Sequence, residues 1–257
     1  MTRIHELVQY ADELLETARI PDYPAALNGL QLENSGDIKG IASAVDFSTR
    51  SIRGAIDAGA NLLILHHGMF WNGFEHLKGP AYQRLRLLIE HDVALYSSHL
   101  PLDLHSTFGN NVLLAKELDL RPTGPFAKYD TIFIGISGES DIDTVSLAEK
   151  ARKFVKALGS DVRLTSISRT RRTKRWAMCT GAGASSDTIK EAVKMGVDTL
   201  IVGEGPHHTS VMAEENDLAI IYAGHYATET LGVRELADHL GKKYDVPASF
   251  VYAPTGL

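Results

Sequence analysis

The stretch Leu62-Leu63-Ile64-Leu65-His66-His67-Gly68 joins four consecutive apolar residues directly to two histidines and a glycine. A short run that is apolar on both faces is typical of a buried strand in a parallel sheet. Ligands of open α/β sheets bind beyond the carboxyl ends of such strands. Imidazole is also the commonest protein ligand for zinc-like metals. The stretch therefore predicts an α/β protein in which His66 and His67 are candidate metal ligands.

The sequence leaves two interpretations of this histidine pair open. Adjacent side chains on an extended strand point to opposite faces, so the pair is poorly placed to chelate one ion while it stays on the strand. A turn at Gly68 would let His66 and His67 hold two neighbouring ions. In the alternative interpretation, one histidine is buried and hydrogen-bonded and the other is exposed.

Strand-like and helix-like segments alternate on both sides of this stretch, which favours an α/β fold with largely parallel or mixed sheets. In the first half, the apolar pattern predicts helices over residues 5–19, 49–58, 81–91 and 110–118, and strands over 41–45, 62–65 and 93–96. In the second half, it predicts helices over 142–158, 187–195, 208–215 and 228–240, and strands over 131–136, 162–167, 176–179, 199–202, 219–222 and 249–252. Residues 121–129 contain two prolines and a glycine and are the best linker candidate. We therefore expect one α/β half over residues 1–125 and a second over 126–257.

A weak internal repeat relates the two predicted halves. The segments Ser51 to His66 and Thr188 to Gly203 both contain a helix, a glycine stop, an apolar strand and a turn. His99 and His225 each follow the next apolar strand, and a carboxylate stands four residues after each of them. Duplication would explain the match and predicts two similar halves, whereas the shared strand–helix pattern of α/β proteins explains part of it without duplication.

The segment Ser98-His99-Leu100-Pro101-Leu102-Asp103 also follows an apolar strand. Asp103 is a hard oxygen ligand or a general base, and His99 is a ligand or a group that orients one. The alternative is that Asp103 caps a helix and that His99 is structural.

The segment Gly224-His225-Tyr226-Ala227-Thr228-Glu229 leads into a predicted helix. If helical geometry begins at once, His225 and Glu229 stand at i and i+4 on one face, within chelating distance of one ion. Alternatively, Glu229 only occupies the first turn, where the helix dipole favours a negative charge.

Five candidate ligands follow predicted strands at the functional edge of the sheets: His66, His67, Asp103, His225 and Glu229. They exceed the three protein ligands of a typical catalytic zinc site. They suit a pair of divalent ions bridged by a carboxylate, for which Glu229 is the better candidate. Nitrogen and oxygen ligands without thiolate favour zinc, manganese, iron, cobalt or nickel over magnesium or calcium. Such a pair lowers the pKa of bound water, so hydrolysis is the expected chemistry.

Two further segments carry polar or charged clusters. In the internal repeat, the segment that contains Glu204 and His208 corresponds to the segment of His66 and His67. Glu204 and His208 are therefore candidate substrate-binding residues. The alternative is that this segment only begins a helix and that its histidines lie on the surface. The run Arg169–Arg175 carries five positive charges and could hold phosphate or RNA. A solvated hairpin or a subunit contact is the favoured interpretation of this run.

Composition restricts the class of protein. The 257 residues are 44% hydrophobic and 23% charged, as in globular proteins, which excludes a disordered, collagen-like or coiled-coil chain. The net charge of −6 argues against nucleic acid as the main partner. Cys179 is the single cysteine, the N-terminus turns polar too early for a secretory signal, and no apolar stretch is long enough to span a bilayer. We therefore expect a cytoplasmic protein that does not act at membranes.

The chain resembles the Nif-three-like family, whose members are also labelled type 2 GTP cyclohydrolase I homologues. The resemblance extends from near residue 28 to near residue 235 and rests on these motifs: Asn28-Gly29-Leu30-Gln31, Ile64-Leu65-His66-His67-Gly68-Met69-Phe70-Trp71, His99-Leu100-Pro101-Leu102-Asp103, Gly109-Asn110-Asn111 and Gly224-His225-Tyr226-Ala227-Thr228-Glu229.

This resemblance implies two linked α/β halves and a ring-shaped homohexamer with metal sites facing an internal cavity. It also implies a dinuclear metal centre whose ligands fall on the five residues reached above from their chemistry. We therefore expect a dinuclear-metal hydrolase of a small nucleotide-like or phosphorylated substrate, with His99 handling protons. A GTP cyclohydrolase-type activity follows from the resemblance alone. The alternative function is a non-catalytic, metal-binding hexameric scaffold or interaction protein.

Overall fold

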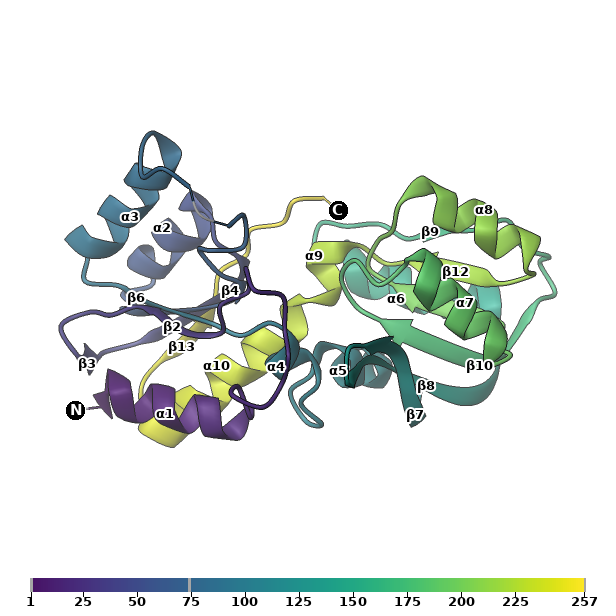
Figure 1. The fold of residues 1–257 in the computed structure, drawn as a ribbon, viewed down its shortest axis with the longest axis horizontal. Helices are drawn as coiled ribbons and strands as arrows, with labels where there is room; N and C mark the ends of the chain where they lie inside the picture. The colour runs from purple at the N-terminus through teal and green to yellow at the C-terminus, as the bar shows by residue number, and fades with distance from the viewer. Residues whose placement is uncertain (1, 74, 257) are drawn as a thin grey trace. The chain divides into compact units, whose positions relative to one another are not determined.

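The computed structural model describes residues 2–73 and 75–256, and the chain divides into two compact units (Figure 1). The first unit contains the residues up to Phe108 together with Gly232–Ala253. The second unit contains Gly109–Leu231 and the C-terminal residues from Pro254 onwards. Among the described residues, no helix combines the length and the apolar character needed to cross a membrane.

The first unit is built around a five-stranded sheet with the strand order β13-β4-β5-β6-β2. Strands β13, β4, β5 and β6 are parallel, and β2 is antiparallel to β6. The carboxyl ends of β4, β5 and β6 therefore lie at one edge of this sheet. The elements of the unit are β1 (Thr2–Arg3), α1 (Ile4–Leu14), β2 (Gly29–Leu32), β3 (Asp37–Ile38), β4 (Ile41–Asp46), α2 (Thr49–Asp57), β5 (Leu62–His67), α3 (Pro80–Glu90), β6 (Ala94–Ser97), α4 (Leu100–Asp103), α10 (Thr230–Tyr244, from Gly232 onwards) and β13 (Ala248–Phe250).

Helices cover both faces of this sheet, with α1 and α10 on one side and α2 and α3 on the other (Figure 1). Side chains of β5 alternate between the two layers, as strand geometry requires. Leu62 and Ile64 pack with α1 and α10, whereas Leu63 and Leu65 pack with α2 and α3. Burial on both faces explains why this stretch is apolar throughout.

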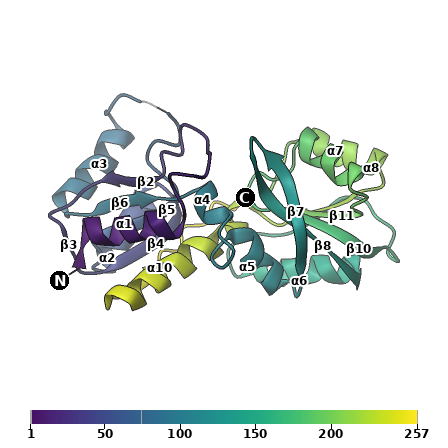
Figure 2. The same ribbon diagram turned by 60° about the horizontal axis from the view of Figure 1, so that its bottom comes forward.

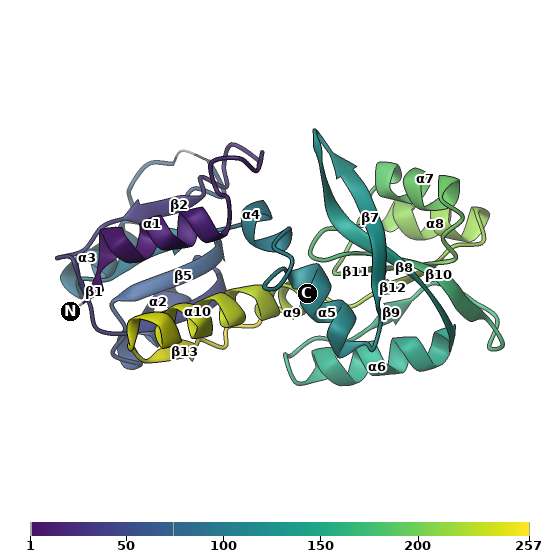
Figure 3. The same cartoon turned by 90° about the horizontal axis from the view of Figure 1, so that it is seen from below.

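The second unit has a six-stranded sheet with the order β7-β8-β10-β11-β12-β9, in which β10, β11 and β12 are parallel. Helices α7 and α8 cover one face and α6 covers the other (Figure 3). The elements of the unit are α5 (Asn110–Glu117), β7 (Pro122–Tyr129), β8 (Ile132–Asp143), α6 (Thr144–Lys156), β9 (Arg163–Leu164), β10 (Arg172–Cys179), α7 (Ser186–Lys194), β11 (Thr199–Val202), α8 (His207–Glu215), β12 (Ala219–Tyr222) and α9 (His225–Thr228).

The two units share a common pattern of elements, which confirms the predicted α/β fold with two similar halves. In each unit three parallel strands alternate with two helices, and a short antiparallel strand pairs with the third strand. The helix after the first of these strands begins with a serine cap in both units. The hydroxyl of Ser48 accepts from the backbone of Ser51, and that of Ser185 accepts from the backbone of Thr188.

Two details of the chain's organisation differ from the sequence-based expectation. Residues 121–129 do not form a linker, because Pro122–Tyr129 is β7, which lies at the edge of its sheet (Figure 2). Proline is tolerated on an edge strand, where its missing N–H breaks no ladder bond. The units also separate after Phe108 rather than near residue 125, and α10 returns to the first unit, where Val233 and Leu236 pack in the core with α1.

Candidate metal centre

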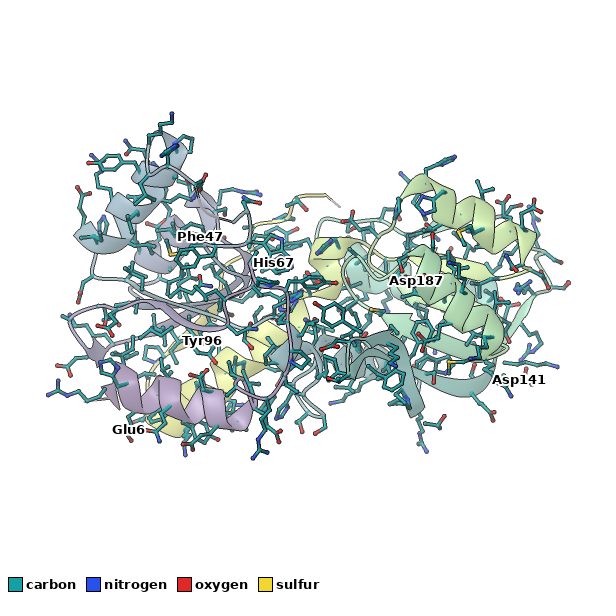
Figure 4. All side chains as sticks on the ribbon, in the orientation of Figure 1. Glu6, Phe47, His67, Tyr96, Asp141 and Asp187 are labelled. Atoms are coloured by element: carbon teal, nitrogen blue, oxygen red, sulfur yellow. The ribbon has the colours of Figure 1, made fainter. Side chains whose placement is uncertain are left out.

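Three buried histidines come together in the first unit at the carboxyl ends of its parallel strands. His66 and His67 end β5, and His99 follows β6; Figure 4 labels His67 at this edge. The ring centroids lie 4.9 Å apart for His66 and His67 and 4.9 Å apart for His66 and His99. One nitrogen from each ring lies within 4.8 Å of the others, which is suitable for metal binding. The rings of His66 and His67 therefore lie closer together than side chains on opposite faces of a strand would, and both rings are buried.

The Nδ1 atom of each imidazole is held by an oxygen atom. His66 Nδ1 lies 3.0 Å from the backbone oxygen of Ser98, which can only accept, so this nitrogen carries the proton. His67 Nδ1 lies 2.8 Å from Asp46 Oδ1, and His99 Nδ1 lies 2.8 Å from Asp22 Oδ1. A proton on Nδ1 places the lone pair on Nε2. This is the arrangement in which a carboxylate or carbonyl orients a metal-binding histidine.

Asp103 adds a carboxylate to this cluster. It is the last residue of α4 and is 8% exposed, and its Oδ2 lies 3.4 Å from His66 Nε2. Its position at the end of the helix does not fit the capping alternative, because an N-cap residue precedes the first turn. The side chain instead faces the His66 nitrogen that the Nδ1 hydrogen bond leaves with a lone pair.

The segment that carries Asp22 and Asn28 holds His99 in place. Asn28 Oδ1 accepts from the backbone of His99 at 2.7 Å, and Asp22 Oδ2 accepts from the side chain of Asn28 and the backbone of Leu100. Burial works to raise the pKa of Asp22, but hydrogen bonding and charge from His99 outweigh it and lower the pKa. Asp22 is therefore held as an anion beside the Nδ1 atom of His99.

The second unit carries the other predicted pair of ligands at the corresponding edge of its sheet. His225 Nε2 lies 3.0 Å from Glu229 Oε2, so the two side chains meet at i and i+4 as their spacing predicts. Glu204 Oε1 accepts from His225 Nδ1 at 2.7 Å, and Glu229 is 3% exposed. This histidine therefore shares with the three in the first unit an oxygen on Nδ1, and like His66 it has a carboxylate facing Nε2.

Gly181 leaves room for the Glu229 carboxylate. Its φ is +62°, and a Cβ atom at this position would lie 2.0 Å from Glu229 Oε1. Its backbone N–H donates to Thr228 Oγ1 at 3.0 Å, which ties this turn to α9. The loop after β10 therefore shapes the pocket around the carboxylate.

The carboxylates around His225 favour a cation. Burial alone would lower the pKa of this imidazole, but Glu229 and Glu204 outweigh it and raise the pKa to about 9. The two carboxylates therefore favour a positive charge at this position, which a proton or a bound cation can supply.

For metal-free protein, we expect the free energy of unfolding to fall as pH rises from about 7 through about 9. A group whose pKa is raised by folding stabilises the folded chain while it is protonated. The stabilisation from His225 is fully present below the ordinary pKa of 6.5 and is lost as pH passes about 9. The loss is on the order of 3 kcal/mol. Urea unfolding between about pH 6 and pH 10 measures it. His225→Gln should remove most of this pH dependence of the free energy of unfolding, whereas His207→Gln, at an exposed histidine, should leave it unchanged. The same pH dependence in both variants would contradict the attribution to His225.

The remaining sequence-predicted residues have varied environments. Glu204 contacts His225, but His208 is exposed on α8, with Nε2 3.3 Å from Ser186 Oγ. In the basic run, Arg171 pairs with Asp217 at 2.6 Å and Arg172 with Asp141 at 2.5 Å. These ion pairs involve two of the five cations in the run. The run leads into β10, which among the described strands pairs with β8 and β11 and not with the preceding β9, so the predicted hairpin is not formed.

Sequence reasoning did not identify Asp22 and Asp46, which hold two of the imidazoles. Asp46 ends the apolar run of β4, so its position at a strand end was a usable signal. Asp22 lies between two prolines in a segment without periodicity, and nothing local marked it.

The comparison with known families and proteins agrees with this architecture. The sequence profile of Duf34/NIF3 (NGG1p interacting factor 3) matches residues 2–253. The chain belongs to the Duf34/NIF3 family. A Deinococcus radiodurans relative named GTP cyclohydrolase 1 type 2 homolog is 36% identical, with 98% of this chain and 94% of the relative covered. A Pyrococcus abyssi relative of the same name is 38% identical, with 98% of each chain covered.

Solved structures of Duf34/NIF3-like proteins have the same fold. One titled "protein ybgI, unknown function" has a TM-score of 0.89 and 32% identity, and both chains are covered completely. The TTHA1606 protein from Thermus thermophilus has a TM-score of 0.82 and 30% identity, again with complete coverage of both chains. These two proteins therefore share the mixed-sheet fold of this chain.

The residues present fit divalent metal ions. The first unit offers buried imidazole nitrogen and carboxylate oxygen, the second offers the partly buried His225 beside the buried Glu229, and within each unit a nitrogen and an oxygen approach one another closely. Donors of this kind suit zinc, manganese, iron, cobalt or nickel. Both units therefore carry groups, buried or partly buried, that could hold a metal ion.

Proposed function

We propose that this Duf34/NIF3 protein is a hydrolase that uses two divalent metal ions and acts on a small nucleotide-like or phosphorylated substrate. The ligands in this proposal are His66, His67, Asp103, His225 and Glu229, with Glu229 as the bridging group. The names of the curated relatives support hydrolysis of a nucleotide, since GTP cyclohydrolase 1 type 2 homolog is the name of each relative described above.

The observation that carries the proposal is the repeated orientation of the imidazoles. Four histidines in two units each direct Nδ1 at an oxygen, which belongs to Ser98, Asp46, Asp22 or Glu204. Metal-binding histidines almost always donate the other ring N–H to an oxygen in this way, which frees Nε2 for the metal. Three of the four, His66, His67 and His225, are proposed ligands, and His99 has the same orientation beside His66 and His67. Two carboxylates that face these nitrogens supply the oxygen ligands.

Two bound divalent ions would lower the pKa of water and polarise a carbonyl or phosphoryl oxygen. The side chains provide the remaining functions of a hydrolytic site. His99 can accept a proton at Nε2, because the Asp22 carboxylate holds Nδ1 and stabilises the resulting imidazolium. His99 is therefore the proposed proton-handling residue.

A cavity in the second unit supports a small-molecule substrate. Its volume is about 520 Å³, and Glu204, Tyr222 and Gly224 are among the residues that line it. Small-molecule sites have volumes of roughly 300–1,000 Å³. Glu204 therefore has two roles in the proposal: it orients His225 and contacts the substrate. His208 is a second proposed substrate contact, on the neighbouring α8.

A panel of nucleotides and phosphoesters tests hydrolysis directly. The protein is first reconstituted separately with manganese, iron, cobalt, nickel and zinc, because the ligand set does not select one of them. We expect metal-dependent turnover that Asp103→Asn reduces by at least roughly tenfold to a hundredfold, the scale found even for residues that only support a metal ligand. Tightly bound metal with no turnover on any compound would instead support a non-catalytic scaffold.

A homohexameric ring is the proposed assembly, and the family resemblance supports it. Light scattering of the purified protein should give about six times the mass of one chain. The mass of a monomer or dimer would contradict the proposed ring.

A further inference from the structure

Two aromatic side chains of the first unit, Tyr23 and Trp71, lie against the imidazole cluster and take no part in the proposed metal chemistry. The Trp71 ring centroid lies 4.5 Å from that of His67 and 4.6 Å from that of His99. The Tyr23 ring centroid lies 5.9 Å from that of His99 and 6.4 Å from that of Trp71. The four rings therefore form a continuous aromatic surface beside the candidate metal ligands.

The two aromatic rings differ from the imidazoles in their exposure. His67 and His99 are buried, but Tyr23 is 45% exposed and Trp71 is partly exposed. The other tryptophan of the chain, Trp176, is completely buried in the core of the second unit. Tyr23 and Trp71 therefore present aromatic surface to solvent at the place where a substrate would reach the metal ligands.

The turn that carries Trp71 follows β5 directly and is held by Gly68 and Gln31. The Trp71 N–H donates to the Gly68 carbonyl at 3.3 Å, which closes a turn directly after His67. Gln31 Oε1 accepts from the Met69 N–H at 2.7 Å, and a Cβ on Gly68 would lie 2.3 Å from Gln31 Nε2. The glycine thus lets Gln31 lie against the turn and fix it, so Trp71 is positioned together with the histidines.

Tyr23 is positioned by the residue that orients His99. Its backbone N–H donates to Asp22 Oδ1 at 2.7 Å, and the same oxygen accepts from His99 Nδ1 at 2.8 Å. The Asp22 carboxylate therefore holds both the imidazole of His99 and the backbone of Tyr23. The aromatic surface is organised before any ligand binds, which lowers the ordering cost of binding.

We propose that Tyr23 and Trp71 bind the planar heteroaromatic ring of the substrate by stacking, and that the substrate is therefore a base-containing compound rather than a phosphorylated compound without a ring. Aromatic side chains bind any nucleobase through its π face. This inference rests on the proposed function for the reaction beside the ring, and it adds the class of substrate and the residues that select it.

Tryptophan fluorescence tests the proposal without turnover. In Trp176→Phe, Trp71 is the single tryptophan and its emission reports on the aromatic surface. GMP and AMP are compared with ribose 5-phosphate, which has the sugar and phosphate but no base. We expect both purine nucleotides to quench Trp71 saturably and ribose 5-phosphate to leave the emission unchanged.

Two leucine variants separate stacking from general packing. Tyr23→Leu should weaken GMP binding roughly tenfold, within the range found for removal of one base-stacking side chain. Tyr82→Leu is the matched control, because Tyr82 is a tyrosine of the same unit that is 48% exposed on α3. Its GMP affinity should equal that of the parent protein.

Equal affinities for GMP and ribose 5-phosphate would overturn the proposal, as would equal effects of the two leucine variants. If Trp176→Phe does not fold, calorimetric titration of GMP into the wild-type protein and Trp71→Leu decides the question in the same way. GMP binding that depends on Tyr23, in a protein without hydrolytic activity, would overturn the proposed function and leave the stacking site standing.

Discussion

Replacing His66 by alanine should remove at least one equivalent of divalent metal from each chain while the fold is retained. The imidazole is completely buried, its Nδ1 is held by the Ser98 carbonyl, and its Nε2 lies 3.4 Å from Asp103. Loss of this ring removes one of the proposed nitrogen ligands. Elemental mass spectrometry of reconstituted protein gives the metal content, and circular dichroism checks the fold.

A matched control for this variant is His91→Ala. His91 is an exposed histidine directly after α3 in the same unit, so its loss removes an imidazole without touching the cluster. Its metal content should equal that of the wild-type protein. Full metal content in folded His66→Ala would mean that this residue is not a ligand.

A methyl group at position 181 should weaken metal binding at least roughly tenfold, although it changes no proposed ligand. The new Cβ in Gly181→Ala would lie 2.0 Å from Glu229 Oε1 and 3.4 Å from His225 Nε2. The carboxylate is the end of a rotatable side chain, so the clash is relieved by moving that carboxylate. We expect a metal titration to show the loss of affinity, because ligands must keep their geometry to bind.

The backbone cost of this substitution needs a separate control, since the φ of Gly181 is +62°. Gly59 has a φ of +70° and open space where a Cβ would be placed. Both alanine variants should lose about 1 kcal/mol of stability from the left-handed conformation, but only Gly181→Ala should lose metal. Equal metal affinity in the two variants would contradict the placement of the Glu229 carboxylate.

The parts of the fold that could be predicted from sequence are those with strong local patterns. β5 is apolar on both faces because helices cover both sides of its sheet, and this burial is visible as an unbroken apolar run. The repeat across the two halves corresponds to a real similarity of elements, including the serine caps at Ser48 and Ser185. The spacing of His225 and Glu229 also predicted their contact, because helical periodicity is a local property.

The parts that could not be predicted depend on contacts between distant segments. Asp22 reaches His99 across 77 positions of sequence, and no pattern around Asp22 signals this contact. The prolines of β7 suggested a linker because an edge strand cannot be recognised without its partner strand. The return of α10 to the first unit depends on its packing with α1, which again involves opposite ends of the chain.

The metal content of wild-type protein and Glu229→Ala, determined side by side by elemental mass spectrometry, tests the central proposal most directly. Glu229 is the proposed bridging ligand and is 3% exposed, so its removal should affect both ions without disturbing the surface. We predict close to two equivalents of divalent metal per chain in the wild-type protein and at least one fewer in the variant. Little metal in the wild-type protein after reconstitution, or the same content in both proteins, would contradict the dinuclear centre.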